Sequence, residues 1–140
     1  MPVTNGVSNL DHSIEKANAW LADVAGEFGT HDRRFAYRVT RAWMHVLRDR
    51  LPAPIAAHFA SQLPELLRGV FYDGWNPSQV PGKYDREEYL RRFARDVNIH
   101  DIEVNQAARL VTKVVRRHVS AGALDELLDA LPEDIRQIAA

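Results

Sequence analysis

The chain has 140 residues, a formal net charge of −1 and 46% hydrophobic residues, which is sufficient for one ordinary globular domain. It contains no cysteine, which excludes disulfides, thiol nucleophiles and cysteine-based zinc sites and fits a reducing compartment. No apolar run approaches the roughly 20 residues that span a bilayer, and the first residues lack the basic and apolar regions of a signal peptide. We therefore expect a cytoplasmic protein without a membrane partner.

Helical periodicity begins near Leu10. Apolar residues three and four apart predict a first helix with one continuous core-facing stripe from Ile14 to Phe28, ending at Gly29. A second helix is predicted to open at Asp32, whose carboxylate suits an N-cap. Two shorter helices are expected on either side of Pro64, because proline ends one helix and suits the start of the next.

An irregular stretch rich in proline and glycine, residues 73–84, is predicted to be a linker between two repeats. Repeat one then covers about residues 10–72 and repeat two about residues 85–139. Asp85 and Glu88 are spaced as a capping box at the start of repeat two. Further helices are predicted near Ile102, Ser120 and Pro132, and no segment alternates as a strand would, so the expected fold class is all-α with about eight helices.

The two halves of the chain resemble each other. Residues 40–70 align without a gap with residues 108–138, so that Leu63-Pro64-Glu65 falls on Leu131-Pro132-Glu133. After a one-residue slip, His31-Asp32 aligns with His100-Asp101, and we interpret both aspartates as helix caps. A fixed internal period indicates one supersecondary unit used twice. Because one repeat alone would expose its apolar stripe, we predict a tandem duplication of a four-helix unit forming one compact domain with pseudo-two-fold symmetry.

Four segments carry a family resemblance: LRDRLP at 47–52, HFASQLPELLRGVFYDGWNP at 58–77, YLRRFA at 89–94 and LPEDIR at 131–136. On these segments the chain resembles the bacterial family called domain of unknown function 2267, over roughly residues 19–138. The resemblance implies an all-helical cytoplasmic domain with a duplicated helical unit. It implies no activity.

No recognisable catalytic or metal-binding pattern occurs. None of the six histidines lies four residues from another, and no HExxH, GxSxG or P-loop motif is present. Neighbouring carboxylates, such as Glu133 and Asp134, fall at predicted helix starts, where they complement the helix dipole. We therefore expect no enzyme activity, no metal and no cofactor.

The most unusual local feature is a group of large side chains around the end of the predicted fourth helix: Arg68, Phe71, Tyr72 and Trp75. Aromatic residues beside a long loop are common anchors of interfaces. They also commonly fill a seam between packed units, and this second interpretation is favoured. If the aromatic side chains are exposed, they are the binding site, and Arg68 orients an anionic group or holds the linker carbonyls.

The sequence thus favours a cytoplasmic binding or regulatory module that acts by protein–protein interaction, with another protein or a second copy as partner. The alternative is a small-ligand sensor with a pocket between the repeats, near Arg68, Tyr72 and Trp75. The basic residues of repeat two are interleaved with acidic ones and accompany no nucleic-acid-binding motif, so nucleic acid is not a favoured partner. An exposed apolar patch would favour protein binding, and a cavity with convergent polar groups would favour the sensor.

Overall fold

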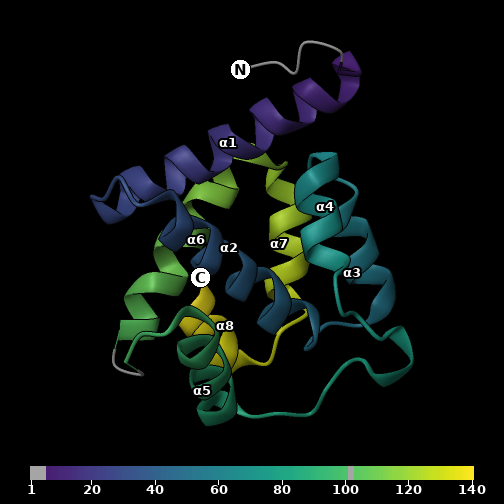
Figure 1. Ribbon diagram of the computed structural model, residues 1–140. Helices are drawn as coiled ribbons and strands as arrows, with labels where there is room; N and C mark the ends of the chain where they lie inside the picture. Colours follow the sequence, from purple (N-terminus) through teal and green to yellow (C-terminus); the bar gives the residue numbers. More distant parts are fainter. Residues whose placement is uncertain (1–5, 101–102) are drawn as a thin grey trace.

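The computed structural model describes residues 6–100 and 103–140, and over these residues it contains eight α helices, one short 3₁₀ turn and no strand (Figure 1). This confirms the all-α class and the helix number. The helices are α1 Ser8–Phe28, α2 Arg33–Arg48, α3 Ala53–Ala60, α4 Glu65–Tyr72, α5 Arg86–Val97, α6 Val104–His118, α7 Ala121–Asp129 and α8 Glu133–Ala139, with the turn η1 at Pro77–Gln79 inside the linker.

Local signals in the sequence set several helix ends. Gly29 ends α1 in the left-handed conformation, at φ 68°, which glycine adopts without steric cost. Asp32 caps α2 by accepting hydrogen bonds from two backbone amides, and Ser120 caps α7 by accepting one, from Ala123. The predicted cap Asp101 lies outside the described residues.

The predicted capping box of α5 forms only in part. Asp85 accepts a hydrogen bond from the backbone amide of Glu88 at 2.9 Å. The Glu88 carboxylate instead accepts hydrogen bonds from Arg91 and Arg92, one turn further along the helix. Local ion pairs on the helix surface therefore take the place of the reciprocal cap.

The helices of the two halves interleave around one hydrophobic cluster (Figure 1). Helix α1 packs on α6 and α5 packs on α2, so each half covers the other, while α3 packs on α7. In the aligned halves α1 corresponds to α5, α2 to α6 and α3 to α7. If the halves are exchanged, the contact between α1 and α6 therefore becomes the contact between α5 and α2, and the contact between α3 and α7 stays the same. His58 and Glu126, which occupy equivalent positions in the aligned halves, are 2.9 Å apart across the contact between α3 and α7. This arrangement supports the duplication, which stays a prediction.

The halves differ most in their first helix. Helix α1 has 21 residues and α5 has 12, so at the offset of the aligned halves α5 corresponds to the part of α1 from Ala17 to Phe28. Residues 8–16, which we call the α1 extension, have no α-helical counterpart in the second half. Figure 1 shows this end of α1 lying across the top of the bundle, beside α4.

Candidate interaction surface

The four residues that the sequence singles out lie close together but are buried to different degrees. Phe71 is 1% exposed and belongs to the core. Tyr72 and Trp75 are half-buried and pack against that core, with 5.2 Å between their ring centroids. These aromatic side chains therefore help to close the end of the core, and a role for them in binding stays a prediction.

Arg68, the fourth of these residues, binds the chain just before its own helix. Its Nε donates to the carbonyl oxygen of Ala60 at 3.1 Å and its Nη2 to that of Leu63 at 2.8 Å. These oxygens lie at the end of α3 and in the turn that follows, where helical carbonyls lack intrahelical partners. Arg68 thus holds the turn between α3 and α4, and not the linker carbonyls.

The carbonyls at the end of α4 and at the first linker residue are held by α2, through two residues that the sequence analysis missed. Buried Arg48 donates from Nη1 to the carbonyl oxygens of Phe71 and Asp73, at 2.7 and 2.8 Å, and its Nε donates to Asp49 at 2.9 Å. His45 lies 2.6 Å from the carbonyl oxygen of Val70, which can only accept, so His45 Nε2 carries the proton.

Burial lowers the pKa of His45, and the neighbouring arginines act in the same direction. The ring is therefore held in its neutral form. Arg48 lies inside the LRDRLP segment that carries the family resemblance, so the motif marked its position while giving no indication of its contacts.

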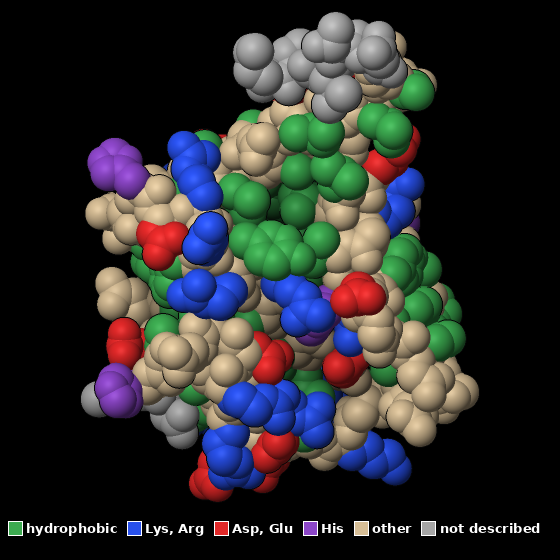
Figure 2. Space-filling view, viewed as in Figure 1, with side chains coloured by type: hydrophobic (Ala, Val, Ile, Leu, Met, Phe, Trp, Pro, Cys, Tyr) green, Lys and Arg blue, Asp and Glu red, His purple; other side chains and the backbone are tan. Residues whose placement is uncertain are grey.

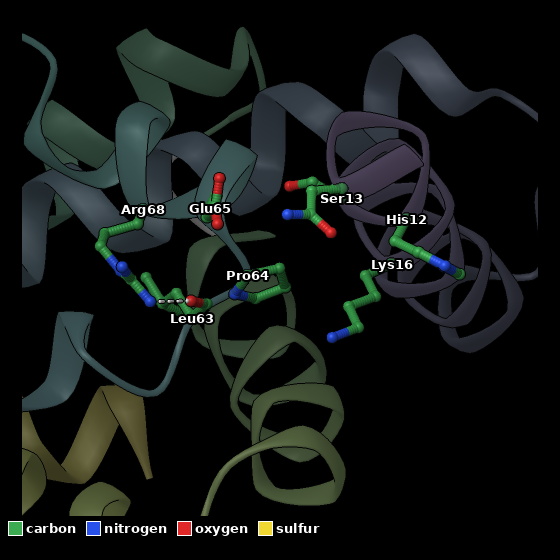
Figure 3. A pocket seen from close by; sticks show the side chains of 8 residues that line it. His12, Ser13, Lys16, Leu63, Pro64, Glu65 and Arg68 are labelled. Atoms are coloured by element: carbon green, nitrogen blue, oxygen red, sulfur yellow. Dashed lines mark hydrogen bonds between the residues drawn. The ribbon is translucent and has the colours of Figure 1, made fainter. Parts of the chain in front are cut away.

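A groove of about 540 Å³ lies between α1 and the turn that joins α3 to α4 (Figure 3). Ser13 reaches across its end, because its Oγ accepts a hydrogen bond from the backbone amide of Leu66 at 3.1 Å. In Figure 3 the amine of Lys16 extends toward Pro64. Arg68 also lines the groove, but its Nε and Nη2 donate to backbone carbonyls.

A second cavity, of about 250 Å³, lies at the seam between the two halves. Phe28 and Phe35 line it from the first half and contact each other edge to face, with centroids 5.1 Å apart. Ile99 and Leu110 line it from the second half. Glu27, Glu103 and Gln106 also line it, so its walls are of mixed polarity. Residues of both repeats line this cavity, and Trp75 is not among them.

A band of exposed hydrophobic side chains lies on α1, α2 and α4, and we call it the apolar face. The large hydrophobic residues that are exposed in the described part of the chain belong to these three helices or directly precede α1: Val7, Leu10, Ile14, Tyr37 and Leu66. Their exposed fractions run from 39% at Ile14 to 61% at Val7. Figure 2 shows hydrophobic side chains in a band that runs from α1 downward between α2 and α4.

Arginines border the apolar face along α2 (Figure 2). Arg33, Arg34 and Arg38 are exposed, and among the described residues no carboxylate lies within ion-pair distance of any of them. Arg41 pairs with Asp73 at 3.3 Å at the lower end of the face. The face therefore has a cationic side whose charges are available to a partner.

The basic residues of the second half are in a different state. Arg91 and Arg92 pair with Glu88, and Lys113 and Arg117 pair with Glu27. Hydrogen bonds from Arg117 and Lys113 hold the pKa of Glu27 below its usual value. These charges are neutralised within the chain, which agrees with the low preference for nucleic acid inferred from the sequence.

Residues 17–138 match a family model described as an uncharacterized conserved protein, DUF2267. The chain belongs to the DUF2267 family. Curated proteins give no match. None of the described helices combines the length and the apolar character needed to cross a membrane.

The DUF2267 match separates two parts of the surface. The residues that hold the linker and the turn, Arg48, His45 and Arg68, fall inside the match. The α1 extension falls before it, so Leu10 and Ile14 lie outside the segment that defines the family. The apolar face thus includes residues of α2 and α4 inside the match and residues of the α1 extension outside it.

Proposed function

We propose that this DUF2267 chain is a non-enzymatic cytoplasmic module that binds protein through the apolar face. The observation that carries the proposal is the band of exposed hydrophobic side chains over α1, α2 and α4, in which Leu66 lies against α1 close to exposed Leu10 and Ile14. Monomeric proteins rarely leave contiguous apolar patches without a use. Tyrosine and arginine, the residue types of the α2 side, are enriched in protein interfaces.

Support for a non-catalytic role comes from the titratable groups. The largest upward pKa shifts belong to Tyr84 and Tyr89, and burial causes both. Both side chains are part of the core, and neither lines the groove or the seam cavity. Glu27 does line the seam cavity, but ion pairs with Arg117 and Lys113 lower its pKa. Catalytic sites instead gather perturbed groups around a cleft.

Site-specific photo-crosslinking in the native host tests the proposal. A photoreactive amino acid at Tyr37 or Leu66 is expected to crosslink a partner, because both positions lie on the apolar face. The matched control is Glu87 on α5, whose side chain is 79% exposed and lies at the opposite end of the bundle (Figure 1). The partner is then identified and its binding repeated with purified proteins. Equal crosslinking from all three positions would contradict the proposal.

The seam cavity favours a second candidate, a small-ligand sensor. Its walls come from both halves and combine apolar with polar side chains, so a ligand there would bind both repeats at once. Such a ligand is expected to raise the melting temperature, and Leu110→Trp, which fills the cavity, should abolish the rise. Leu10→Ser serves as the control, since it changes the apolar face and leaves the cavity intact.

A further inference from the structure

We propose that the exposed arginines at the start of α2 bind an acidic segment of a partner protein. The proposal rests on the proposed function, that this chain binds protein, and adds the chemistry of the partner. We call Arg33, Arg34 and Arg38, with Tyr37 between them, the arginine cluster. Its charges are explained neither by a neighbouring side chain nor by the folding of α2.

The three arginines of the cluster have no ion-pair partner in the described part of the chain. Helix α2 itself contains no acidic residue. The carboxylate nearest in sequence, Asp32, accepts hydrogen bonds from the backbone amides of Arg34 and Phe35 and so caps the helix. The positive charge of the cluster is therefore left for a group outside these residues.

The stability of α2 does not explain the cluster either. Arg33 and Arg34 lie in the first turn of the helix, where the positive end of the helix dipole makes a cation unfavourable. The first turns of α4, α5 and α8 carry glutamate or aspartate instead. Residues that break such a local rule are expected at functional sites.

The other half of the chain builds the corresponding helix without the cluster. Carried back along α2, the gapless alignment of the halves places Tyr37 and Arg38 on the asparagine and glutamine at 105–106 of α6. The residues before these pairs, Ala36 and Val104, are both buried, so the two helices bury the same positions. The pair at 105–106 is exposed and uncharged. An exposed tyrosine and arginine are therefore not needed to pack a helix of this kind.

The spacing of the cluster matches carboxylates on a partner helix. Arg34 and Arg38 are four residues apart, and Tyr37 lies three residues after Arg34, so all three share one side of α2. Guanidinium groups bind carboxylates through two parallel hydrogen bonds. Arginine and tyrosine are also the residue types that most often anchor protein interfaces. Aspartates or glutamates three or four residues apart would meet both arginines across the ring.

Larger polyanions fit the cluster less well. Proteins that bind nucleic acid typically neutralise about 6–10 phosphates, and segments that bind anionic membranes carry about 4–8 lysines and arginines. The cluster has three arginines, and Arg41, one turn further along α2, already pairs with Asp73. The net charge of −1 gives the chain no general attraction to such surfaces.

Fluorescence anisotropy with a designed peptide tests the proposal. The probe is a labelled, alanine-rich helical peptide with glutamates three and four residues apart around a central leucine, and glutamine replaces every glutamate in the control peptide. The native chain is expected to bind the glutamate peptide at micromolar concentration and less tightly as salt rises. Arg34→Gln with Arg38→Gln should weaken this binding at least about tenfold.

A second variant separates this result from a general effect of charge. Lys83 and Arg86 are also exposed and also have no ion pair among the described residues. Lys83→Gln with Arg86→Gln therefore removes the same charge at the start of α5 and should leave binding of the peptide unchanged. All four substituted side chains are exposed, so circular dichroism should show a native fold in both variants.

Three results would overturn the inference: equal affinity for the glutamate and glutamine peptides, native affinity in the variant of Arg34 and Arg38, or tighter binding of a 20-nucleotide oligothymidylate or of phosphatidylserine vesicles through the same arginines. If the peptide does not bind but Leu66 still crosslinks a partner in the host, the inference fails and the proposed function stands.

Discussion

Trp43 joins the two halves of the fold, and its replacement should be among the most damaging single changes. The side chain is fully buried on α2 and lies near Phe59, with ring centroids 5.9 Å apart. Replacing a buried tryptophan by alanine costs about 3–5 kcal/mol, from lost contacts and the cavity left behind. A domain of this size is stable by about 5–15 kcal/mol, so Trp43→Ala should remove a large share of the free energy of unfolding.

A hydrogen bond adds a second contribution that can be measured separately. Trp43 Nε1 donates to Thr112 Oγ1 on α6 at 2.9 Å, within the core. Thr112→Val leaves the indole N–H buried without an acceptor, which costs about 1–3 kcal/mol. Trp43→Phe removes the donor, so the double variant Trp43→Phe with Thr112→Val should cost less than the two single variants added together. We expect a coupling of about 1 kcal/mol.

Urea denaturation followed by far-UV circular dichroism gives all four free energies without relying on tryptophan fluorescence. If Trp43→Ala costs under about 1 kcal/mol, the ring does not fill the core as described. If the two single changes simply add, the bond between the halves contributes nothing. The first result would refute the argument from burial of the ring, and the second would refute the argument from the hydrogen bond.

Three further predictions concern the linker, the core and the two halves. His45→Gln should flatten the pH dependence of stability. The pKa of His45 in the folded protein lies below the ordinary 6.5, so the unfolded chain binds more protons than the folded one. The native protein therefore loses stability as the pH falls below about 6.5, and the variant should lose less. Melts of both proteins between pH 7.5 and 5.5 check this, and parallel losses would contradict it. Trp75→Ala should lower stability by about 1–2 kcal/mol, since the half-buried ring packs on the core, yet leave the crosslinking of a partner from Leu66 intact; a partner lost without any change in the melt would instead show that Trp75 is a binding residue. Residues 1–80 and 81–140, expressed separately, should each melt without cooperativity, because each half covers the apolar surface of the other; one sharp transition from either half would disprove a shared core.

The helix ends could be predicted from sequence because their causes are local. A capping carboxylate or hydroxyl, as in Asp32 and Ser120, acts on amides two or three residues away, and Gly29 acts through its own φ angle. Any sequence window of a few residues contains both the group and its target. The all-α class follows from the same kind of signal, repeated along the chain.

The contacts of Arg48 and the exposure of Ile14 could not be predicted in this way. Arg48 binds carbonyls 23 and 25 residues away, a distance over which sequence spacing carries no information. Ile14 has the spacing of the core stripe of α1, and periodicity alone placed it in the core. It is 39% exposed because no helix covers that side of the α1 extension. Periodicity shows which residues share a face, but only the tertiary packing decides whether that face is covered.

Comparing the two halves of this chain helps to separate folding from binding. A position that recurs in both halves, such as the Leu-Pro-Glu at 63–65 and 131–133, can be explained by the packing that each half needs. The α1 extension does not recur. The first residue of α5 corresponds to Ala17 of α1, so α5 has no part that matches residues 8–16, and yet it packs on α2. The extra turns are therefore not required to build a helical unit of this kind. They carry Leu10 and Ile14 on one side, and these two residues are part of the apolar face. If the extension serves binding, Leu10→Ser with Ile14→Ser should abolish the crosslinking of a partner from Leu66 while shifting the melting temperature of the chain by no more than about 2 °C. A large fall in the melting temperature would show that the extension belongs to the core, and the apolar face would lose its strongest support.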